Sequence, residues 1–469
     1  MTKQKTKQGK ALHQIKPAFG GGIDRRTFLR STAAVGAGLV LSPVVLGQAG
    51  GSKKEDDINV ALLGAGEQGD VLMNACRNIP GVRFKAVCDI WQAWNLKRLS
   101  NKLKKYKIEH NAYTDYKEML DKEKNLNAVI IATPDFWHAE QTVACLKAGL
   151  HVYCEKEMSN TLEGAKKMVQ AAKETGKLLQ IGHQRRSNPR YIHCYQKLIR
   201  DAKLLGRITT VNGQWNRGKA SCEDLLWPKE TDIDEATLQK HGFKSMQQFR
   251  NWRWYKGFGG GPIVDLGSHQ IDIYSWFLEA NPKSVMASGG TDYWKGHEWY
   301  DHVMVIYEYE TKQGTVRAFY QTITTNSGNG YFELFMGDEG ALLISEASGR
   351  GDVYREKWLP DDHWDKWVKM GYLKAPPEEK KEEEPAATTE GAVDVRQSPK
   401  PPRFDLPVIM VKPYHQPHLE NFFDAVRGKA KLNCPAEVGY ETAVIVLKVN
   451  EAIEAGKKLE FKPEDFKPA

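Results

Sequence analysis

Two segments of the chain carry side chains that can move a proton. Lys156 follows an apolar run that ends at Cys154, and a lysine at the end of a strand can stabilise negative charge on a substrate oxygen. Farther along, Asp265, His269 and Asp272 lie four and three residues apart, so on one helix they form a single polar stripe. A histidine between carboxylates is oriented by them and accepts a proton near neutral pH. We therefore predict that Lys156, Asp265 and His269 are catalytic, with Asp265 steadying His269.

Each of these residues also has a structural interpretation. Lys156 could form a surface ion pair with Glu157, and a lone histidine in an apolar helix is more often structural than catalytic. Two carboxylates and one histidine along one stripe make a poor closed shell for a metal ion. We predict no metal site.

A glycine motif, Gly64-x-Gly66-x-x-Gly69, joins an apolar strand to a helical pattern. Gly64 permits the tight turn, Gly66 lets a pyrophosphate approach the backbone, and Gly69 lets the helix pack closely on the strand. The next apolar run ends at Asp89, about twenty residues farther on, where a carboxylate is expected to bind the ribose hydroxyls. The motif predicts dinucleotide binding. Because no arginine follows Asp89 to bind a 2′-phosphate, we expect NAD, with NADP less favoured.

Apolar runs alternate with helical patterns up to residue 181 and predict a doubly wound, parallel sheet of about six strands. Ligands bind beyond the carboxyl ends of such strands. The residues expected there to contact the cofactor are Thr133, Pro134, Glu155 and Lys156, and the segment 182–186 follows the last strand.

Beyond residue 182, alternating and β-branched runs predict a mainly antiparallel sheet that is buried on one face. Two helices, 418–426 and 436–455, are predicted to finish the chain. The predicted fold class is thus α/β, with a Rossmann domain over 50–181 and a C-terminal α/β domain over 182–469. A charged, proline-containing segment at 375–402 cannot bury a core, and we expect a mobile loop there.

The formal net charge of +8 is concentrated in the first 49 residues, which carry eight Lys and Arg against one Asp. The rest of the chain is nearly neutral, so its charge predicts no nucleic-acid partner. The leader, 1–49, has paired Arg25-Arg26, a weakly apolar run and a small-residue end at Ala49, and it resembles a twin-arginine signal peptide. We expect recognition by the twin-arginine export machinery, cleavage and a periplasmic location.

Seven cysteines occur without a CxxC pair, and several lie inside apolar patterns. An odd number of such residues favours buried thiols over a disulfide framework.

Four motifs together carry a family resemblance: the glycine motif, Thr133-Pro134 with His138, Glu155-Lys156, and Asp265-x-Gly267-x-His269. They resemble the Gfo/Idh/MocA family of glucose–fructose oxidoreductase and inositol dehydrogenase, over nearly all of residues 57–460. The resemblance implies a Rossmann domain joined to a domain with an open antiparallel sheet. It also implies NAD(P)-linked chemistry on a sugar or polyol, with Lys156, Asp265 and His269 as the catalytic set and His138 at the cofactor. The family usually has Glu-Lys-Pro, and here Glu157 replaces the proline.

Substrate contacts are predicted at His183, Arg185, Trp215 and Asp272. Several aromatic residues of the second domain suit stacking on sugar faces or, equally, a core: Trp215, Trp252, Trp254, Tyr255, Trp294 and Trp299. Arg185, with Arg186 and Arg190, could bind a substrate carboxylate or instead face solvent or the cofactor.

The sequence therefore favours an NAD-dependent oxidoreductase that acts on a secondary alcohol of a sugar, glycoside or polyol with a tightly bound cofactor. An NAD-dependent glycoside hydrolase that works by transient oxidation and elimination is the alternative, and a sensor that retains a cofactor ranks third. The open sheet also makes a homo-oligomer an expectation.

Overall fold

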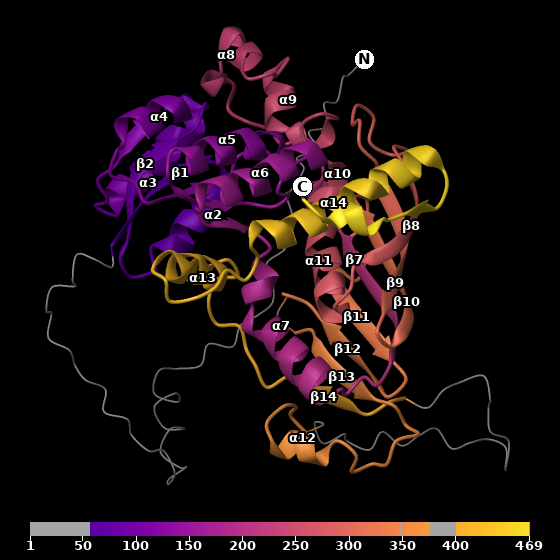
Figure 1. Ribbon diagram of the computed structural model, residues 1–469. Helices are drawn as coiled ribbons and strands as arrows, with labels where there is room; N and C mark the ends of the chain where they lie inside the picture. The colour runs from indigo at the N-terminus through magenta and orange to yellow at the C-terminus, as the bar shows by residue number, and fades with distance from the viewer. Residues whose placement is uncertain (1–56, 348, 376–399, 469) are drawn as a thin grey trace, which may run out of the picture. The chain divides into compact units, whose positions relative to one another are not determined.

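The first layer of the protein is a six-stranded parallel sheet (Figure 1). The computed structural model describes residues 57–347, 349–375 and 400–468, so the predicted leader and most of the predicted loop at 375–402 lie outside the described residues. The strands are β1 (Ile58–Leu63), β2 (Val82–Cys88), β3 (Asn111–Tyr113), β4 (Ala128–Ile131), β5 (His151–Cys154) and β6 (Leu179–Ile181). Their order is β3-β2-β1-β4-β5-β6, so the chain reverses its direction of winding between β1 and β4. This confirms the doubly wound sheet, and it locates the ligand crevice at the carboxyl ends of β1 and β4.

The helices that flank this sheet and the rest of the fold begin and end as follows. They are α2 (Glu67–Cys76), α3 (Lys97–Lys105), α4 (Tyr116–Lys122), α5 (Asp135–Lys147), α6 (Leu162–Thr175), α7 (Pro189–His193), α8 (Glu235–Lys240), α9 (Met246–Arg250), α10 (Gly261–Asp265), α11 (Gly267–Leu278), α12 (Asp365–Lys369), α13 (Gln416–Val426) and α14 (Ala436–Ala455). Within the described part of the chain, none of them is both long and apolar enough to cross a membrane.

The turn between β1 and α2 depends on two of its glycines. Gly64 has φ +90°, and a Cβ built on it would lie 2.5 Å from the backbone oxygen of Ala132. A Cβ on Gly69 would lie 2.0 Å from the backbone oxygen of Gly64. Any side chain at either position therefore forces the backbone apart, whereas a Cβ on Gly66 meets only the Asn95 amide, at 3.7 Å. The first and third glycines build the turn, and the second leaves space in front of it.

Helix α13 belongs with the Rossmann layers, although it lies more than 230 residues after β6. Its side chains Leu419, Phe422 and Phe423 are buried in the cluster that contains the residues of β1 and α2. The Gln180 amide in β6 donates to the backbone oxygen of His418. The predicted domain boundary at residue 181 therefore leaves out one helix of the Rossmann core. The periodicity of the sequence predicts that this amphipathic helix exists, but it does not show which sheet the helix covers.

A second, nine-stranded sheet has the order β14-β13-β12-β11-β7-β10-β9-β8-β15. Its strands are β7 (Ile208–Asn216), β8 (Pro282–Gly290), β9 (His302–Thr311), β10 (Gly314–Ile323), β11 (Tyr331–Gly337), β12 (Gly340–Ile344), β13 (Gly351–Arg355), β14 (Arg403–Asp405) and β15 (Leu459–Glu460). Neighbouring strands are antiparallel except β7 and β10, which pair in parallel. The sheet is thus mixed and mainly antiparallel, as expected.

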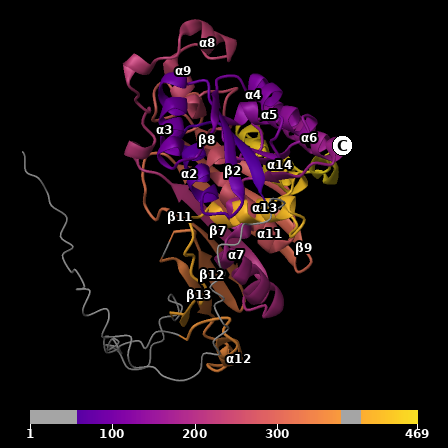
Figure 2. The same ribbon diagram turned by 90° about the vertical axis from the view of Figure 1, so that its left-hand side faces the viewer.

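Helix α14 contacts both sheets, and α10 and α11 pack against it. Helix α11 packs on β7 and β10, and α14 packs on β8, β6 and α6 (Figure 2). The single helix predicted to carry Asp265, His269 and Asp272 is interrupted at Leu266, between the end of α10 and the start of α11. Asp265 therefore ends α10, whereas His269 and Asp272 both lie on α11.

The segment 217–260, here called the cap, carries α8 and α9 and lies over the carboxyl ends of the Rossmann strands (Figure 1). Its apolar core includes Phe243 and Phe249 and is completed by Trp91 from the Rossmann layers. The Trp91 indole Nε1 donates to the backbone oxygen of Thr231 at 2.6 Å. The cap is therefore fixed on the Rossmann layers by a shared aromatic core.

Candidate active site

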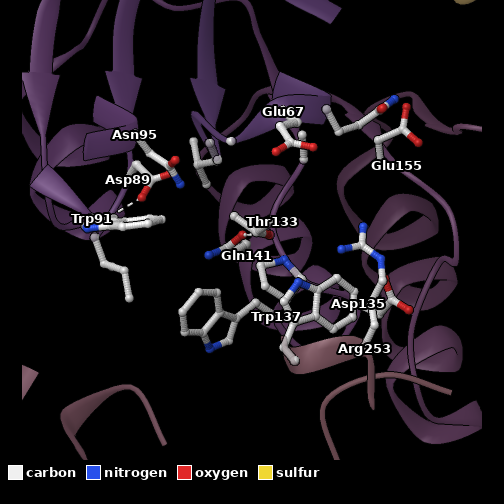
Figure 3. Close-up of a pocket in the computed structure, with 18 of the residues that line it drawn as sticks. Glu67, Asp89, Trp91, Asn95, Thr133, Asp135, Trp137, Gln141, Glu155 and Arg253 are labelled. Atoms are coloured by element: carbon white, nitrogen blue, oxygen red, sulfur yellow. Dashed lines mark hydrogen bonds between the residues drawn. The ribbon is translucent and has the colours of Figure 1, made fainter. Parts of the chain in front are cut away.

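One cavity of about 760 Å³ runs along the carboxyl edge of the parallel sheet, beneath the cap. Figure 3 shows that Asp89, Trp91 and Asn95 gather at one end, whereas Arg253 and Asp135 lie at the other. Of the predicted site residues, ten line this cavity: Gly64, Gly66, Asp89, Thr133, Pro134, Glu155, Lys156, Trp215, Asp265 and His269. Five do not: Gly69, His138, His183, Arg185 and Asp272.

The cofactor end is built from backbone groups and one carboxylate. Asp89 Oδ2 accepts from the backbone N–H of Ala65 at 2.7 Å, and Oδ1 accepts from the N–H of Trp91 at 2.8 Å. Burial raises the pKa of Asp89, while these donors and Arg98 oppose the rise. No side chain caps the first turn of α2, so its N–H groups remain available to an anion. Together with the open space at Gly66, this arrangement fits a dinucleotide.

The turn after β4 continues this end of the cavity. Thr133 Oγ1 donates to Gln141 Oε1 at 2.6 Å, which holds the turn on α5. Asp135 begins α5 and is buried, and burial together with the nearby Asp265 raises its pKa to about 7. A carboxyl group at the wall of the cavity therefore changes its charge near neutral pH.

His138 lies behind the wall and not in the cavity. Its Nδ1 is 2.7 Å from the backbone oxygen of Glu157, and its Nε2 is 2.8 Å from that of Thr133. Burial lowers its pKa to about 4. The prediction of a cofactor contact is wrong for this residue: His138 braces the segments that carry Thr133 and Lys156.

Lys156 forms a partly buried ion pair with Asp265, so its interpretation as a surface pair with Glu157 is wrong. Its Nζ donates to the backbone oxygen of Asp265 and, at 3.0 Å, to Asp265 Oδ1. Arg253 of the cap approaches the other oxygen, Oδ2, at 3.4 Å. Burial alone would raise the pKa of Asp265, but Lys156 and Arg253 lower it well below its usual range. Asp265 is thus an ionised carboxylate that positions Lys156 in the cavity.

Glu157 is fully buried beneath this pair, and the peptide bond between Lys156 and Glu157 is cis. Its Oε1 accepts from the backbone N–H of Met158 at 2.8 Å, and Oε2 has no partner. Burial raises the pKa of Glu157 to about 8.

His269 lines the cavity, but neither predicted carboxylate orients it. Its Nδ1 is buried without a hydrogen-bond partner in the described structure, which leaves Nε2 as the nitrogen that can meet a substrate. Burial, with Lys156 and Arg185 nearby, lowers the pKa of His269 well below its ordinary value. The expected steadying by Asp265 is wrong, because the Asp265 carboxylate pairs with Lys156 and Arg253 instead. The Trp215 ring lies beside His269, with ring centroids 5.4 Å apart.

Asp272 and His183 are buried away from the cavity, contrary to the prediction of substrate contacts. Asp272 pairs with Arg186 at 2.8 Å and accepts from Thr442 Oγ1 at 3.0 Å. Both ring nitrogens of His183 lack partners, and burial lowers its pKa to about 4. These groups join α11, α14 and the segment after β6, so they support the wall from behind.

Arg185 is also buried, and two carboxylates already neutralise it. It pairs with Glu333 through Nη1 and with Glu346 Oε2 through Nε at 3.1 Å. Tyr191 donates to the second oxygen of Glu333 at 2.8 Å. A role for Arg185 in direct binding of a substrate carboxylate is therefore wrong.

The structure adds residues to the site that were not among the predicted catalytic, cofactor or substrate contacts. They are Gln184, Tyr331, Glu346, Tyr414 and His415 at the substrate end, and Trp137, Arg250, Trp252 and Arg253 near the cap. Of the aromatic residues proposed for stacking, only Trp215 and Trp252 line the cavity. The sequence signal that could have found them is a position just after a strand. Gln184 and Glu346 both have such a position, but neither belongs to a recognisable motif.

Among the described residues, no group of three or more His, Cys, Asp or Glu is arranged to hold a metal ion. All seven cysteines are buried and free, which agrees with the expected thiols.

Two family models match the chain. Residues 58–183 match the oxidoreductase family's NAD-binding Rossmann fold, and residues 196–342 match the GFO/IDH/MocA C-terminal domain. The protein belongs to the Gfo/Idh/MocA family. Its Rossmann layers are therefore an NAD-binding domain, and the resemblance inferred from the four motifs is confirmed.

Curated relatives and solved structures agree with this assignment. The chain is 32% identical over 230 residues to inositol 2-dehydrogenase of Salmonella typhimurium, which covers 49% of this chain and 56% of the relative. It is 26% identical over 317 residues to the scyllo-inositol 2-dehydrogenase (NADP(+)) IolW of Bacillus subtilis, covering 68% and 76%. Levoglucosan dehydrogenase, in complex with NADH and L-sorbose, has the same fold, with 17% identity, a TM-score of 0.63 and coverage of 87% and 99%. Among the first curated relatives, the match spans from 43% to 76% of their own length, about half in most.

Proposed function

We propose that this protein is an NAD-dependent oxidoreductase that moves a hydride between the cofactor and a secondary alcohol of a sugar, glycoside or polyol. One observation carries the proposal: Lys156 and His269 line the same cavity as Gly66 and Asp89. A proton-transfer pair and a dinucleotide site therefore share one enclosed volume. The dehydrogenases among the relatives of this family act on the same class of substrate, as their names state.

The geometry divides the work between two side chains. His269 is neutral at pH 7 because its pKa is lowered by burial, so it can accept the hydroxyl proton at Nε2. The Lys156 ammonium, held by Asp265, stabilises the negative charge that develops on the substrate oxygen. NAD, when bound, supplies the hydride acceptor. Arg253 of the cap lines this end of the cavity and pairs with Asp265.

The proposal specifies NAD over NADP. The Asp89 carboxylate faces the cavity at the end of β2, where it accepts ribose hydroxyls and repels a 2′-phosphate. The nearest arginine, Arg98, pairs with Asp70 at 3.3 Å and is occupied.

We further propose that the cofactor is held tightly and is not exchanged at each turnover. The cap covers the cofactor end through Trp91, and Arg250 of the cap pairs with Glu67 at the start of α2, at 3.1 Å. Release of a dinucleotide would require these contacts to open. The hydride would then return in place, to a second sugar or an outside acceptor.

The test is mass spectrometry of the ligand released by denaturing protein that was purified without added cofactor, followed by assays with sugars and glycosides. Stoichiometric NAD or NADH, with a keto-sugar product, is the expected result. A protein that is empty and binds NAD weakly would disprove retention of the cofactor. Free aglycone without a keto-sugar would replace the dehydrogenase with the NAD-dependent glycoside hydrolase.

We also propose that the leader directs export by the twin-arginine machinery to the periplasm, on the evidence of Arg25-Arg26 and the apolar run that follows. Replacement of both arginines by lysine should leave the protein in the cytoplasmic fraction. Equal export of the variant and the native chain would refute the proposal.

A homo-oligomer is proposed from the outer face of the second sheet. Met286 on β8 and Ile306 on β9 are paired neighbours, and 49% and 41% of their surfaces are exposed. Apolar side chains side by side on a sheet favour burial against a second copy. Light scattering of the native protein and of Ile306→Lys should give an oligomer and a monomer, respectively.

A further inference from the structure

The substrate end of the cavity contains a carboxylate that the proposed proton transfer does not use. Glu346 follows β12, is 5% exposed and lines the cavity. Both of its oxygens accept from Gln184 Nε2 at 3.3 Å, and Oε2 also accepts from Arg185 Nε at 3.1 Å. An ionised carboxylate has about four acceptor positions. Glu346 therefore keeps free lone pairs at the cavity wall.

Behind this wall, two carboxylates share one cation. Arg185 is the cation that pairs with Glu346, and it also pairs with the buried Glu333. Because one guanidinium serves two carboxylates, little positive charge reaches the cavity through Glu346. Two of the cations that line the cavity, Lys156 and Arg253, both pair with Asp265.

The aromatic platform next to this wall suits a ring that carries hydroxyl groups. Trp215 and Tyr331 are stacked, with centroids 4.5 Å apart and an interplanar angle of 20°. The Arg185 guanidinium carbon lies 5.6 Å from the Trp215 ring and 5.7 Å from the Tyr331 ring, so the platform adjoins the Arg185–Glu346 pair. Beside Glu346, Gln184 Oε1 is buried without a partner. A ligand on the platform thus meets hydrogen-bond acceptors from Glu346 and Gln184, and His269 at the edge of Trp215.

We infer that Glu346, with Gln184, determines the substrate class: the site takes uncharged polyhydroxy compounds and rejects sugars that carry a carboxylate or a phosphate. This inference rests on the proposed function, because it concerns the same cavity. Hydroxyl groups of the ligand donate to Glu346, whereas an anionic group at that position would meet a buried carboxylate whose cation, Arg185, is already shared with Glu333.

The experiment compares neutral sugars with their uronic acids on the protein with its cofactor bound. Suitable pairs are methyl glucoside with methyl glucuronide, and methyl galactoside with methyl galacturonide. Single-turnover reduction of the bound cofactor gives a rate constant for each sugar, and quenching of tryptophan fluorescence gives Kd independently of turnover. We expect each uronate to be at least about 100-fold poorer than its neutral partner in both measurements, because a like charge at a buried site is strongly disfavoured.

Glu346→Gln should reduce this discrimination about 10-fold or more, since it removes the negative charge and keeps the shape. The matched control is Glu279→Gln, which removes a carboxylate that pairs with Arg200 and does not line the cavity. The control should keep the preference of the native protein. Thermal melts of both variants verify folding, and the comparison of the native protein with paired ligands needs no variant.

The outcomes separate this inference from the proposed function. Neutral sugars that bind in preference to uronates but are never oxidised would support the inference and refute the dehydrogenase. Uronates that bind or react within about 3-fold of their partners would overturn the inference and leave the dehydrogenase intact. An unchanged preference in Glu346→Gln, or no binding of any neutral sugar, would overturn it as well.

Discussion

The two ends of the cavity are constructed in different ways. The cofactor end consists of backbone groups in consecutive Rossmann loops: the turn at Gly64, the N-terminus of α2, and Asp89 fixed by the N–H groups of Ala65 and Trp91. The substrate end consists of side chains from segments far apart in the chain. Lys156 meets Asp265 across 109 residues, and Arg185 meets Glu346 across 161.

This difference separates two kinds of sensitivity to mutation. At the cofactor end, an added Cβ is the change expected to impair binding or folding, because most of the binding groups belong to the backbone. At the substrate end, a change in the charge or proton affinity of a side chain is expected to impair catalysis, because each function depends on one side chain. The following predictions test that contrast, from the largest expected effect to the smallest.

The first concerns His269, which belongs wholly to the substrate end. His269→Ala should lower kcat/KM by about 1,000-fold, or about 4 kcal/mol, because the proton acceptor is lost. The content of bound NAD should not change, because His269 is remote from the dinucleotide-binding loops. Kinetics together with cofactor analysis by mass spectrometry would measure both. A variant without cofactor would show that the two ends are not separable.

Lys156 lies where the two ends meet. Lys156→Met should lower kcat by about 300-fold, or about 3.4 kcal/mol, through loss of the charge that stabilises the substrate oxygen. Asp265 would keep Arg253 as its partner, so the protein should still fold. Rapid mixing that follows nicotinamide absorbance would isolate the chemical step. A defect confined to KM would assign Lys156 to binding alone.

The next prediction concerns Glu157, which is buried beneath Lys156, and the way stability depends on pH. The pKa of this acid is raised in the folded protein to about 8, so the folded state binds more protons than the unfolded state between about pH 4.5 and 8. The native protein therefore loses stability as pH rises through this range, and Glu157→Gln removes that loss. The stability of the variant relative to the native protein should increase by roughly 3–5 kcal/mol across the window. Urea unfolding at several pH values measures this slope.

The exposed Glu109→Gln is the control for the loss of a carboxyl group as such. If Glu157→Gln and the control gave parallel slopes, the buried acid would not be coupled to folding. If the free energy of unfolding of Glu157→Gln differed from that of the native protein by the same amount at every pH, the substitution would have affected packing alone.

The last prediction contrasts two glycines at the cofactor end. Gly66→Ala should fold normally, because the added Cβ meets only Asn95 at 3.7 Å, but it should weaken NAD about 30-fold, or about 2 kcal/mol, by blocking the pyrophosphate. Gly69→Ala should instead lower the melting temperature, since its Cβ would meet the backbone at 2.0 Å. Calorimetry of unfolding and of cofactor binding distinguishes the two. Equal affinity for NAD in Gly66→Ala and the native protein would remove Gly66 from the site.

The sequence alone determined the parallel sheet of the Rossmann layers, the cofactor end and the identity of Lys156 and His269 as cavity residues, but not the place of α13 in those layers. These features depend on short-range patterns: an apolar run, a glycine turn, a helix, and residues directly after strands. The mainly antiparallel second sheet followed for the same reason, since the alternation of its strands is local.

Only the tertiary structure decided the partners of the charged groups. Asp265 and Asp272 share a stripe on an ideal helix, but in the folded protein Asp265 pairs with Lys156, and Asp272 pairs with Arg186. Arg185 is neutralised by Glu333 and Glu346, which the chain supplies about 150 residues later. Burial and ion pairing depend on which distant segments the fold brings together. No local pattern in the sequence contains that information.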